Sequence, residues 1–313
     1  MIKQLEIQNI NTNETIHLGV DGSFILDKVD WDAPSVSLDS YRVPFQIGTS
    51  FLGVTVGTRK PMIIGYVVAD MKNIDILGMS WNEYYKVQEQ LIEEQKQKLD
   101  KLISINQWIV IKANGYNLKA KPTQPPKYSN NYTENNEVLC YFELQFECFD
   151  PMFYSETKYI ELATVNKMFY FPLEIPEESG VVFGEIQKRK NVLVENDSDV
   201  DCGCIIKVKA NGGIVTNPRI YNANLGEYIE FNGLTLEQDD VLTIITEIGQ
   251  EDAIVHRNET SIDERVISKM IKGSKFIQIK QGTNYYAYEV ENGESAIEVV
   301  IEYTEKKMNI RGM

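Results

Sequence analysis

Apolar and polar residues alternate in short runs along most of the chain, and turn-forming residues separate these runs. The longest alternating run, from Val138 to Cys148, places six apolar residues on one face and Glu143, Gln145 and Glu147 on the other. A period of two predicts a half-buried β-strand of about ten residues. Short strands between turn signals predict a mainly β protein made of sandwiches or barrels.

Three further segments have the pattern of β-hairpins. Two of them contain Asn-Gly, which suits a type I′ turn because both central residues need a positive φ, and the third contains a glycine that can take the left-handed conformation. These candidates are 108–121 around Asn114-Gly115, 285–303 around Asn292-Gly293, and 219–222 with 227–231 across Gly226.

One segment, from about Ser80 to Ile103, has the period of an α-helix. Ser80 and Glu83 form a capping box, in which each side chain binds the backbone N–H of the other residue. An apolar stripe follows at helical spacing, and Glu94 and Lys98 form an i,i+4 pair that supports an exposed face. We expect this helix to pack on a β-domain; an oligomer interface is the alternative.

The length of 313 residues predicts two domains. The boundary is expected just after Phe149-Asp150-Pro151, which gives domains 1–155 and 156–313. Residues 122–136 are rich in Pro, Asn, Ser and Thr and predict a loop. Loops of this length within compact domains are often functional, so we expect this one to contact a neighbour.

Composition narrows the possible functions. The formal charge is −15, from 31 Lys+Arg against 46 Asp+Glu, which argues against a nucleic-acid binder because such proteins need clustered basic residues. With only two His, there is little material for His catalysis. The N-terminus has no apolar signal-peptide core and no run of about 18 apolar residues occurs, so we predict neither secretion nor a membrane span. Synthesis in a reducing cytoplasm is expected.

Two groups of residues are candidates for metal sites. Asp197, Asp199 and Asp201 alternate as in a calcium loop, but the sixth position is Cys202 instead of Gly and the twelfth is Val208 instead of Glu. We expect a solvated loop there; calcium bound in another geometry is the alternative. The thiols of Cys202 and Cys204, and of Cys140 and Cys148, lack the spacing of a zinc knuckle and are expected in the core.

No catalytic motif is found. His17 and His256 are isolated, each inside a predicted strand, and no nucleophile elbow, zinc-protease helix or phosphate-binding loop occurs. We therefore predict no catalytic, cofactor-binding or metal-binding residues, although two carboxylates that meet only in space would escape detection. The 17 tyrosines include the pairs Tyr84-Tyr85 and Tyr285-Tyr286; we expect ordinary strand composition, with sugar stacking or interface filling as the alternative.

Several of these segments, in this order, resemble the distal tail protein (Dit) family of siphovirus-type phage tails and tail-like particles of Gram-positive bacteria. Each motif is short, and together they span nearly the whole chain. In the first half they are Phe24–Trp31, Gly65–Ala69, the helix 80–103, the Asn114-Gly115 hairpin and Phe146–Phe153. In the second half they are Val194–Asn196, Asn217–Asn222 with Gly226–Ile229, Gly233–Ile244, Lys275–Asn284 and Val299–Tyr303. Asp239 stands where that family usually has Gly.

The resemblance implies a structural role. The N-terminal domain would be a split β-barrel with one long α-helix, and six copies would form a ring; the C-terminal domain would be a galectin-like β-sandwich that faces outward. The homohexamer would join the tail tube protein to the tail-tip hub or tail-associated lysin and would anchor receptor-binding or baseplate proteins. The protein would be part of the virion, at the tail tip, after assembly in the host bacterial cytoplasm.

DNA would pass through such a ring without specific binding, and we hypothesise that an acidic lumen repels it. We expect ring contacts at edge strands of the N-terminal domain and at the helix. The main alternative function is a carbohydrate-binding module that attaches the particle to cell-wall glycan through exposed Tyr or Trp. An enzyme, a wall hydrolase with two carboxylates in a cleft, is the second alternative.

Overall fold

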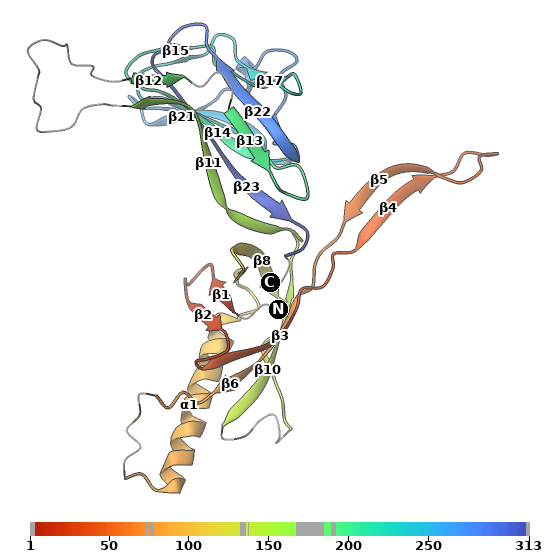
Figure 1. The fold of residues 1–313 in the computed structure, drawn as a ribbon, viewed down its shortest axis with the longest axis vertical. Coiled ribbons are helices and arrows are strands. Elements are labelled where there is room, and N and C mark those ends of the chain that lie inside the picture. Colours follow the sequence, from red (N-terminus) through yellow and green to blue (C-terminus); the bar gives the residue numbers. More distant parts are fainter. Residues whose placement is uncertain are drawn as a thin grey trace, which may run out of the picture. The chain divides into compact units, whose positions relative to one another are not determined.

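The structure is a computed structural model that describes residues 4–72, 74, 78–131, 136, 138–166, 185–188 and 192–310. The fold is mainly β with one long α-helix, as the alternation of the sequence predicts (Figure 1). The chain forms two compact units: unit 1 is Met1–Tyr154 with Met308–Met313, and unit 2 is Ser155–Lys307. No helix in the described ranges is long and apolar enough to cross a membrane.

Unit 1 contains two antiparallel sheets around one core. The first has the spatial order β2 (Thr15–Leu18), β1 (Leu5–Asn9), β7 (Ile109–Ala113) and β8 (Tyr116–Pro122). The second has the order β3 (Phe24–Asp30), β6 (Met62–Val68), β10 (Leu139–Glu147) and β9 (Lys127–Tyr128). The end of β10 also pairs with β8, through Phe146 with Pro122 and Glu147 with Lys121, which joins the two sheets along one side.

The helix α1 (Trp81–Leu102) closes the core of unit 1. It begins as predicted, with Ser80 accepting from the Glu83 N–H and the Glu83 carboxylate accepting from the Ser80 N–H at 2.8 Å. Its buried residues start only at Gln88 and continue with Ile92, Leu99 and Leu102. The last three belong to the same cluster as the inward residues of β6 and β10. The first two turns therefore carry little of the packing.

A two-stranded ribbon interrupts the second sheet between β3 and β6. Its strands are β4 (Val36–Tyr41) and β5 (Ser50–Val56), which pair with each other and with no other strand of the described chain. Figure 1 shows this ribbon, called the arm below, extending away from the other strands of unit 1. The sequence pattern leads to no prediction for residues 36–56.

Unit 2 is a sandwich of two antiparallel sheets. In spatial order, one sheet contains β11 (Phe153–Asn166, which starts in unit 1), β23 (Ile297–Lys307), β14 (Cys204–Ala210), β19 (Val241–Ile245), β20 (Asp252–Arg257) and β21 (Ile262–Arg265), with β12 (Glu185–Lys188) on β11. The other contains β13 (Val192–Asn196), β22 (Gly282–Glu289), β16 (Arg219–Asn222) and β17 (Glu227–Glu230). Short elements are β15 (Val215–Thr216), β18 (Thr235–Leu236) and the 3₁₀ helix η1 (Ile267–Lys269).

The core of unit 2 lies between these sheets. Alternate residues of β14 and β23, such as Ile206 and Val299, meet residues of the opposite sheet, such as Ile220, Ile229 and Tyr286. Each of these five side chains is completely buried. The period of two in the sequence therefore corresponds to one face of each strand turned into this core.

Two of the three predicted hairpins are confirmed. β7 and β8 are joined by Asn114 and Gly115, both at positive φ (51° and 79°), and β16 and β17 by a turn in which Gly226 has φ 66°. The prediction for 285–303 is wrong. β22 and β23 lie in opposite sheets, because β22 pairs with β13 and β16 while β23 pairs with β14. Here the Asn-Gly connects two layers instead of two paired strands.

The long alternating strand and the following loop are close to their predictions. β10 buries Cys140, Phe142, Leu144 and Phe146, as the alternation requires, whereas Val138 lies outside the strand and is exposed. The predicted loop 122–136 contains the short strand β9, which pairs with β10. Residues 132–135 of that loop lie outside the described residues.

Candidate assembly surface

The arm presents an apolar face that nothing in the described chain covers. All six residues of β4 and five of the seven of β5 are exposed. Cross-strand neighbours share a face, and the pairs Val36 with Val56 and Leu38 with Val54 put four aliphatic side chains on one side. Phe51 joins them beyond the bulge near Ser40. Before the bulge, the opposite side is polar, with Ser37, Asp39 and Thr55.

The tip of the arm is apolar as well. Phe45 and Ile47 are fully exposed, at 106% and 101%, and Tyr41 and Val43 are about half exposed. Soluble monomers rarely leave contiguous apolar surface of this kind in water, and an isolated two-stranded hairpin is only marginally stable. The arm is therefore a candidate surface for contact with another chain.

A buried arginine lies at the root of the arm, the segments 31–35 and 57–61 that connect its strands to β3 and β6. The Arg59 side chain is completely buried, and its guanidinium donates to the carbonyls of Pro151 (2.9 Å), Asp32 (2.9 Å) and Trp31 (3.3 Å), and to that of Met308. It also stacks on the Phe153 ring, 4.7 Å from the centroid. Burial is the main cause that lowers the Arg59 pKa. These contacts tie both strands of the root to the two places where the chain crosses to and from unit 2.

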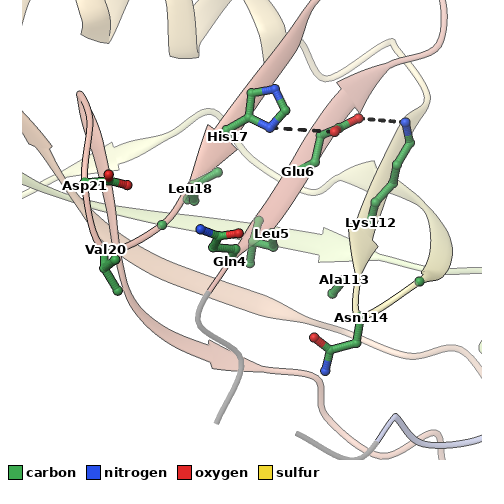
Figure 2. Close-up of a pocket in the computed structure, with 12 residues that line it drawn as sticks. Gln4, Leu5, Glu6, His17, Leu18, Val20, Asp21, Lys112, Ala113 and Asn114 are labelled. Atoms are coloured by element: carbon green, nitrogen blue, oxygen red, sulfur yellow. Dashed lines mark hydrogen bonds and ion pairs between the residues drawn. The ribbon is translucent and has the colours of Figure 1, made fainter. Parts of the chain in front are cut away.

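A depression of about 1090 Å³ lies at one end of the first sheet of unit 1, where β1 begins and β2 and β7 end. The Glu6 carboxylate is one of the groups that line it, 2.6 Å from the Lys112 ammonium and 3.6 Å from His17 Nδ1 (Figure 2). The three residues face one another because Glu6 pairs in register with His17 on β2 and with Lys112 on β7. None of its described lining residues is Ser, Thr or Cys.

Two carboxylates of the acidic loop at 197–201 pair with lysine side chains. Asp201 lies 2.8 Å from the Lys280 ammonium and accepts from the Gln281 N–H, and these contacts outweigh burial so that the Asp201 pKa is lowered. Asp199 lies 3.8 Å from the Lys307 ammonium. Among the residues that the structure describes, no three His, Cys, Asp or Glu gather as metal ligands.

The four cysteines are free and buried. Burial raises the pKa of the Cys148 thiol and of the Cys204 thiol to about 12, and it raises the pKa of the Cys140 thiol as well. Cys202 lies against the Ser198 hydroxyl at 3.1 Å. The thiols thus pack as core residues.

We expect the native protein to resist thiol alkylation at pH 8. A rise in pKa from 9.0 to about 12 lowers the thiolate fraction of Cys148 and Cys204 about a thousandfold, and burial blocks access as well. Labelling with iodoacetamide, followed by intact mass, should modify four thiols only in denaturant. A Val138→Cys variant, at a position 48% exposed, should add one rapidly labelled thiol in the native state. Rapid native labelling of the wild type would contradict this.

The two histidines lie on the surface. His17 takes part in the row with Glu6, and the exposed His256 of β20 has its Nδ1 2.8 Å from the exposed Asp263 of β21. The two tyrosine pairs lie in different surroundings. Tyr286 is buried in the core of unit 2 beside half-exposed Tyr285, whereas Tyr84 and Tyr85 stack with Trp81, 76% exposed, in the first turns of α1.

A second aromatic cluster lies on the outer face of the β16–β17–β22 sheet. The Arg219 guanidinium lies over the rings of Tyr221 and Tyr228, at 5.3 and 4.9 Å from their centroids. Glu289 and Glu230 pair with its charge at 2.9 and 3.3 Å. Two carboxylates and two aromatic rings therefore surround the Arg219 guanidinium on this face.

The fold is that of a phage hub protein. The SPP1 Dit protein (gp 19.1), described as a paradigm of the hub adsorption apparatus in phages that infect Gram-positive bacteria, superposes with a TM-score of 0.60 at 11% identity, over 96% of this chain and 98% of its own. A chain of the phage P2 baseplate in its activated conformation with Ca has a TM-score of 0.44 at 10% identity, over 98% of both chains. No family model and no curated protein matches the sequence.

The likeness to SPP1 Dit establishes the fold and confirms, at that level, the resemblance seen in the sequence motifs. It extends over both units and is not confined to the segments that carry those motifs. The mainly β architecture with a single long helix is accordingly the Dit-like fold.

Proposed function

We propose that the chain is a structural, non-enzymatic component of a phage tail, a distal tail or baseplate hub protein whose unit 1 forms a homohexameric ring. The observation that carries this proposal is the arm, with its apolar face exposed from Val36 to Val56. The likeness of fold to the SPP1 Dit hub protein supports the place in the tail.

The exposed apolar side chains of the arm favour contact with another chain. Burial of apolar surface contributes about 25 cal/mol per Å², so an arm with ten large exposed apolar side chains favours association. In the proposed ring, each arm packs on a different surface of the next copy, so that every copy both gives and receives one contact. Contacts between unlike surfaces of identical chains form a ring where the rotation from copy to copy closes on itself.

The proposed partners follow from this role. The ring would join the tail tube protein to the tail-tip hub or tail-associated lysin, and it would carry receptor-binding or baseplate proteins, in a virion assembled in the host cytoplasm. DNA would pass through it unbound.

The test is the oligomeric state of arm variants, measured by size-exclusion chromatography with light scattering. The wild-type chain, 35.9 kDa, should assemble at high concentration or on addition of tube protein. The double variant Leu38→Asp with Val54→Asp places two charges on the apolar face and should remain a monomer.

The matched control puts the same charges on the polar face of the same strands, with Ser37→Asp and Thr55→Asp, and should assemble like the wild type. A strictly monomeric wild type that also ignores the tube protein would overturn the ring. Equal loss of assembly in both double variants would show that the apolar face is not the contact.

A further inference from the structure

The outer faces of the two sheets of unit 1 differ in chemistry. On the sheet of β2, β1, β7 and β8, every row of outward positions contains polar side chains: Glu6, Gln8, His17, Lys112, Asn117 and Lys119. This is the composition expected where one face of an antiparallel sheet meets water.

The outer face of the sheet of β3, β6 and β10 has an apolar centre. Its centre consists of six half-buried side chains from three adjacent strands, called the β6 patch: Ile25, Ile64, Tyr66, Val68, Leu139 and Tyr141. Tyr66 and Tyr141 pack edge to face, with centroids 5.8 Å apart. Inward neighbours such as Ile63, Val67 and Phe142 form the core of unit 1, to which none of the six belongs.

Polar residues border the β6 patch. Lys28 and Glu143 flank Ile64 on the two neighbouring strands, and Asp30 and Gln145 flank the next row. An apolar centre with a polar rim is the composition of a protein–protein interface.

We propose that the β6 patch receives the apolar face of the arm of a second copy of this chain. The inference rests on the proposed ring and names the surface that each arm contacts. In the described part of unit 1, the arm and the β6 patch are the two apolar surfaces that β-strands form. Two sheets pack face to face at about 10 Å with interdigitated side chains. Neither the arm nor the patch has such a second layer in its own copy, and each can provide it for the other.

The dimensions of the two surfaces match. Outward residues recur every second position along β6, about 7 Å apart, as Ile64, Tyr66 and Val68. The apolar pairs of the arm, Val36 with Val56 and Leu38 with Val54, recur at the same spacing. The ribbon of two strands can therefore lie on the patch of three strands with its rows between those of β6.

The hydrogen bonds at the root prevent the arm from reaching the β6 patch of its own chain. The Gly57 N–H donates to the Ser35 carbonyl at 2.8 Å, which pairs the two strands at the root. Arg59 binds the carbonyls of Trp31 and Asp32 on the opposite strand. Folding back onto β6 would require a reversal of both strands within this pinned segment, so the arm reaches a patch only on another copy.

Photo-cross-linking tests the contact. A benzophenone amino acid replaces Leu38 in the full chain, and the assembled protein, mixed from normal and ¹⁵N-labelled copies, is irradiated and mapped by mass spectrometry. We expect cross-links between copies to residues of β3, β6 and β10. Ile64→Lys, which places a charge in the patch, should abolish that product, whereas Gln8→Lys on the polar sheet should leave it unchanged.

The outcomes separate this inference from the ring itself. Cross-links from position 38 to another surface of a second copy would overturn the patch as the receiver and leave the ring in place. Cross-links only within one chain, in a protein that stays monomeric, would overturn both. The probe at Ser37, on the polar face of the arm, should give no patch cross-links; if it matches the probe at Leu38, the proposed orientation of the arm is wrong.

Discussion

Replacing Arg59 with Met should lower the unfolding free energy of unit 1 by about 3–5 kcal/mol. Methionine keeps most of the apolar stem but removes every donor, so the carbonyls of Pro151, Asp32, Trp31 and Met308 lose their shared partner in a completely buried position. Each buried acceptor left without a hydrogen bond costs about 1–3 kcal/mol, and partial relaxation recovers some of the total. Arg59→Lys keeps the charge but lacks the planar guanidinium with its several donors, and its stability should fall between those of the wild type and Arg59→Met.

Urea unfolding of the full chain, followed by tryptophan fluorescence, measures this effect. All three tryptophans, Trp31, Trp81 and Trp108, lie in unit 1, so the signal reports that unit. The control is the adjacent Lys60→Met, whose side chain is 66% exposed and whose ammonium lies 3.9 Å from Glu147. An exposed pair of this kind contributes about 0–1 kcal/mol. Equal shifts for the Arg59 and Lys60 variants would refute the role of the buried guanidinium.

The importance of Arg59 could not be predicted from sequence. An arginine between two strands has the pattern of a surface residue, and its burial depends on carbonyls from segments 27 to 249 residues away. The arm escapes prediction for a related reason. Its alternation is visible as Val36, Leu38, Val54 and Val56, but a bulge at Asp39 and Ser40 breaks the period, and no strand of the described chain outside the arm pairs with it.

The features that the sequence predicts correctly are local. The capping box at Ser80 and the Asn114-Gly115 turn each depend on residues within one turn, and both are confirmed. Strand pairing is not local, which is why the pattern of 285–303 predicts one hairpin where the structure has two sheets.

The distribution of charge between the two units is likewise not visible in the net charge of the sequence. Unit 1 has 15 Lys+Arg against 19 Asp+Glu, a net −4, and unit 2 has 16 against 27, a net −11. Most of the excess acid thus lies outside the unit that we expect to form the ring. An acidic lumen would need its few carboxylates on one face, and it stays a prediction.

Replacing Gly293 with Ala should destabilise unit 2 by about 3–5 kcal/mol. The glycine has φ +91°, and an added Cβ would lie 2.0 Å from the Ile214 carbonyl oxygen and 2.9 Å from Val215 Cα, both backbone atoms that cannot turn aside. A non-glycine residue in this conformation costs about 1–3 kcal/mol, and displacement of the β15 backbone adds to that. The displaced segment would also strain the bond from the Thr216 N–H to the Asn292 carbonyl.

Gly226→Ala separates the two contributions. Gly226 also has a positive φ, +66°, in the same unit, but a Cβ added there would meet no such neighbour within 4 Å, so only the conformational cost of about 1–2 kcal/mol applies. The far-ultraviolet dichroism transition of unit 2 in urea measures both variants. If Gly293→Ala loses no more than Gly226→Ala, the approach of the Ile214 and Val215 backbone places no constraint on this turn. A larger loss means that this glycine is required where Asn292-Gly293 passes the backbone of β15, between two sheets that the sequence pattern alone would merge into one.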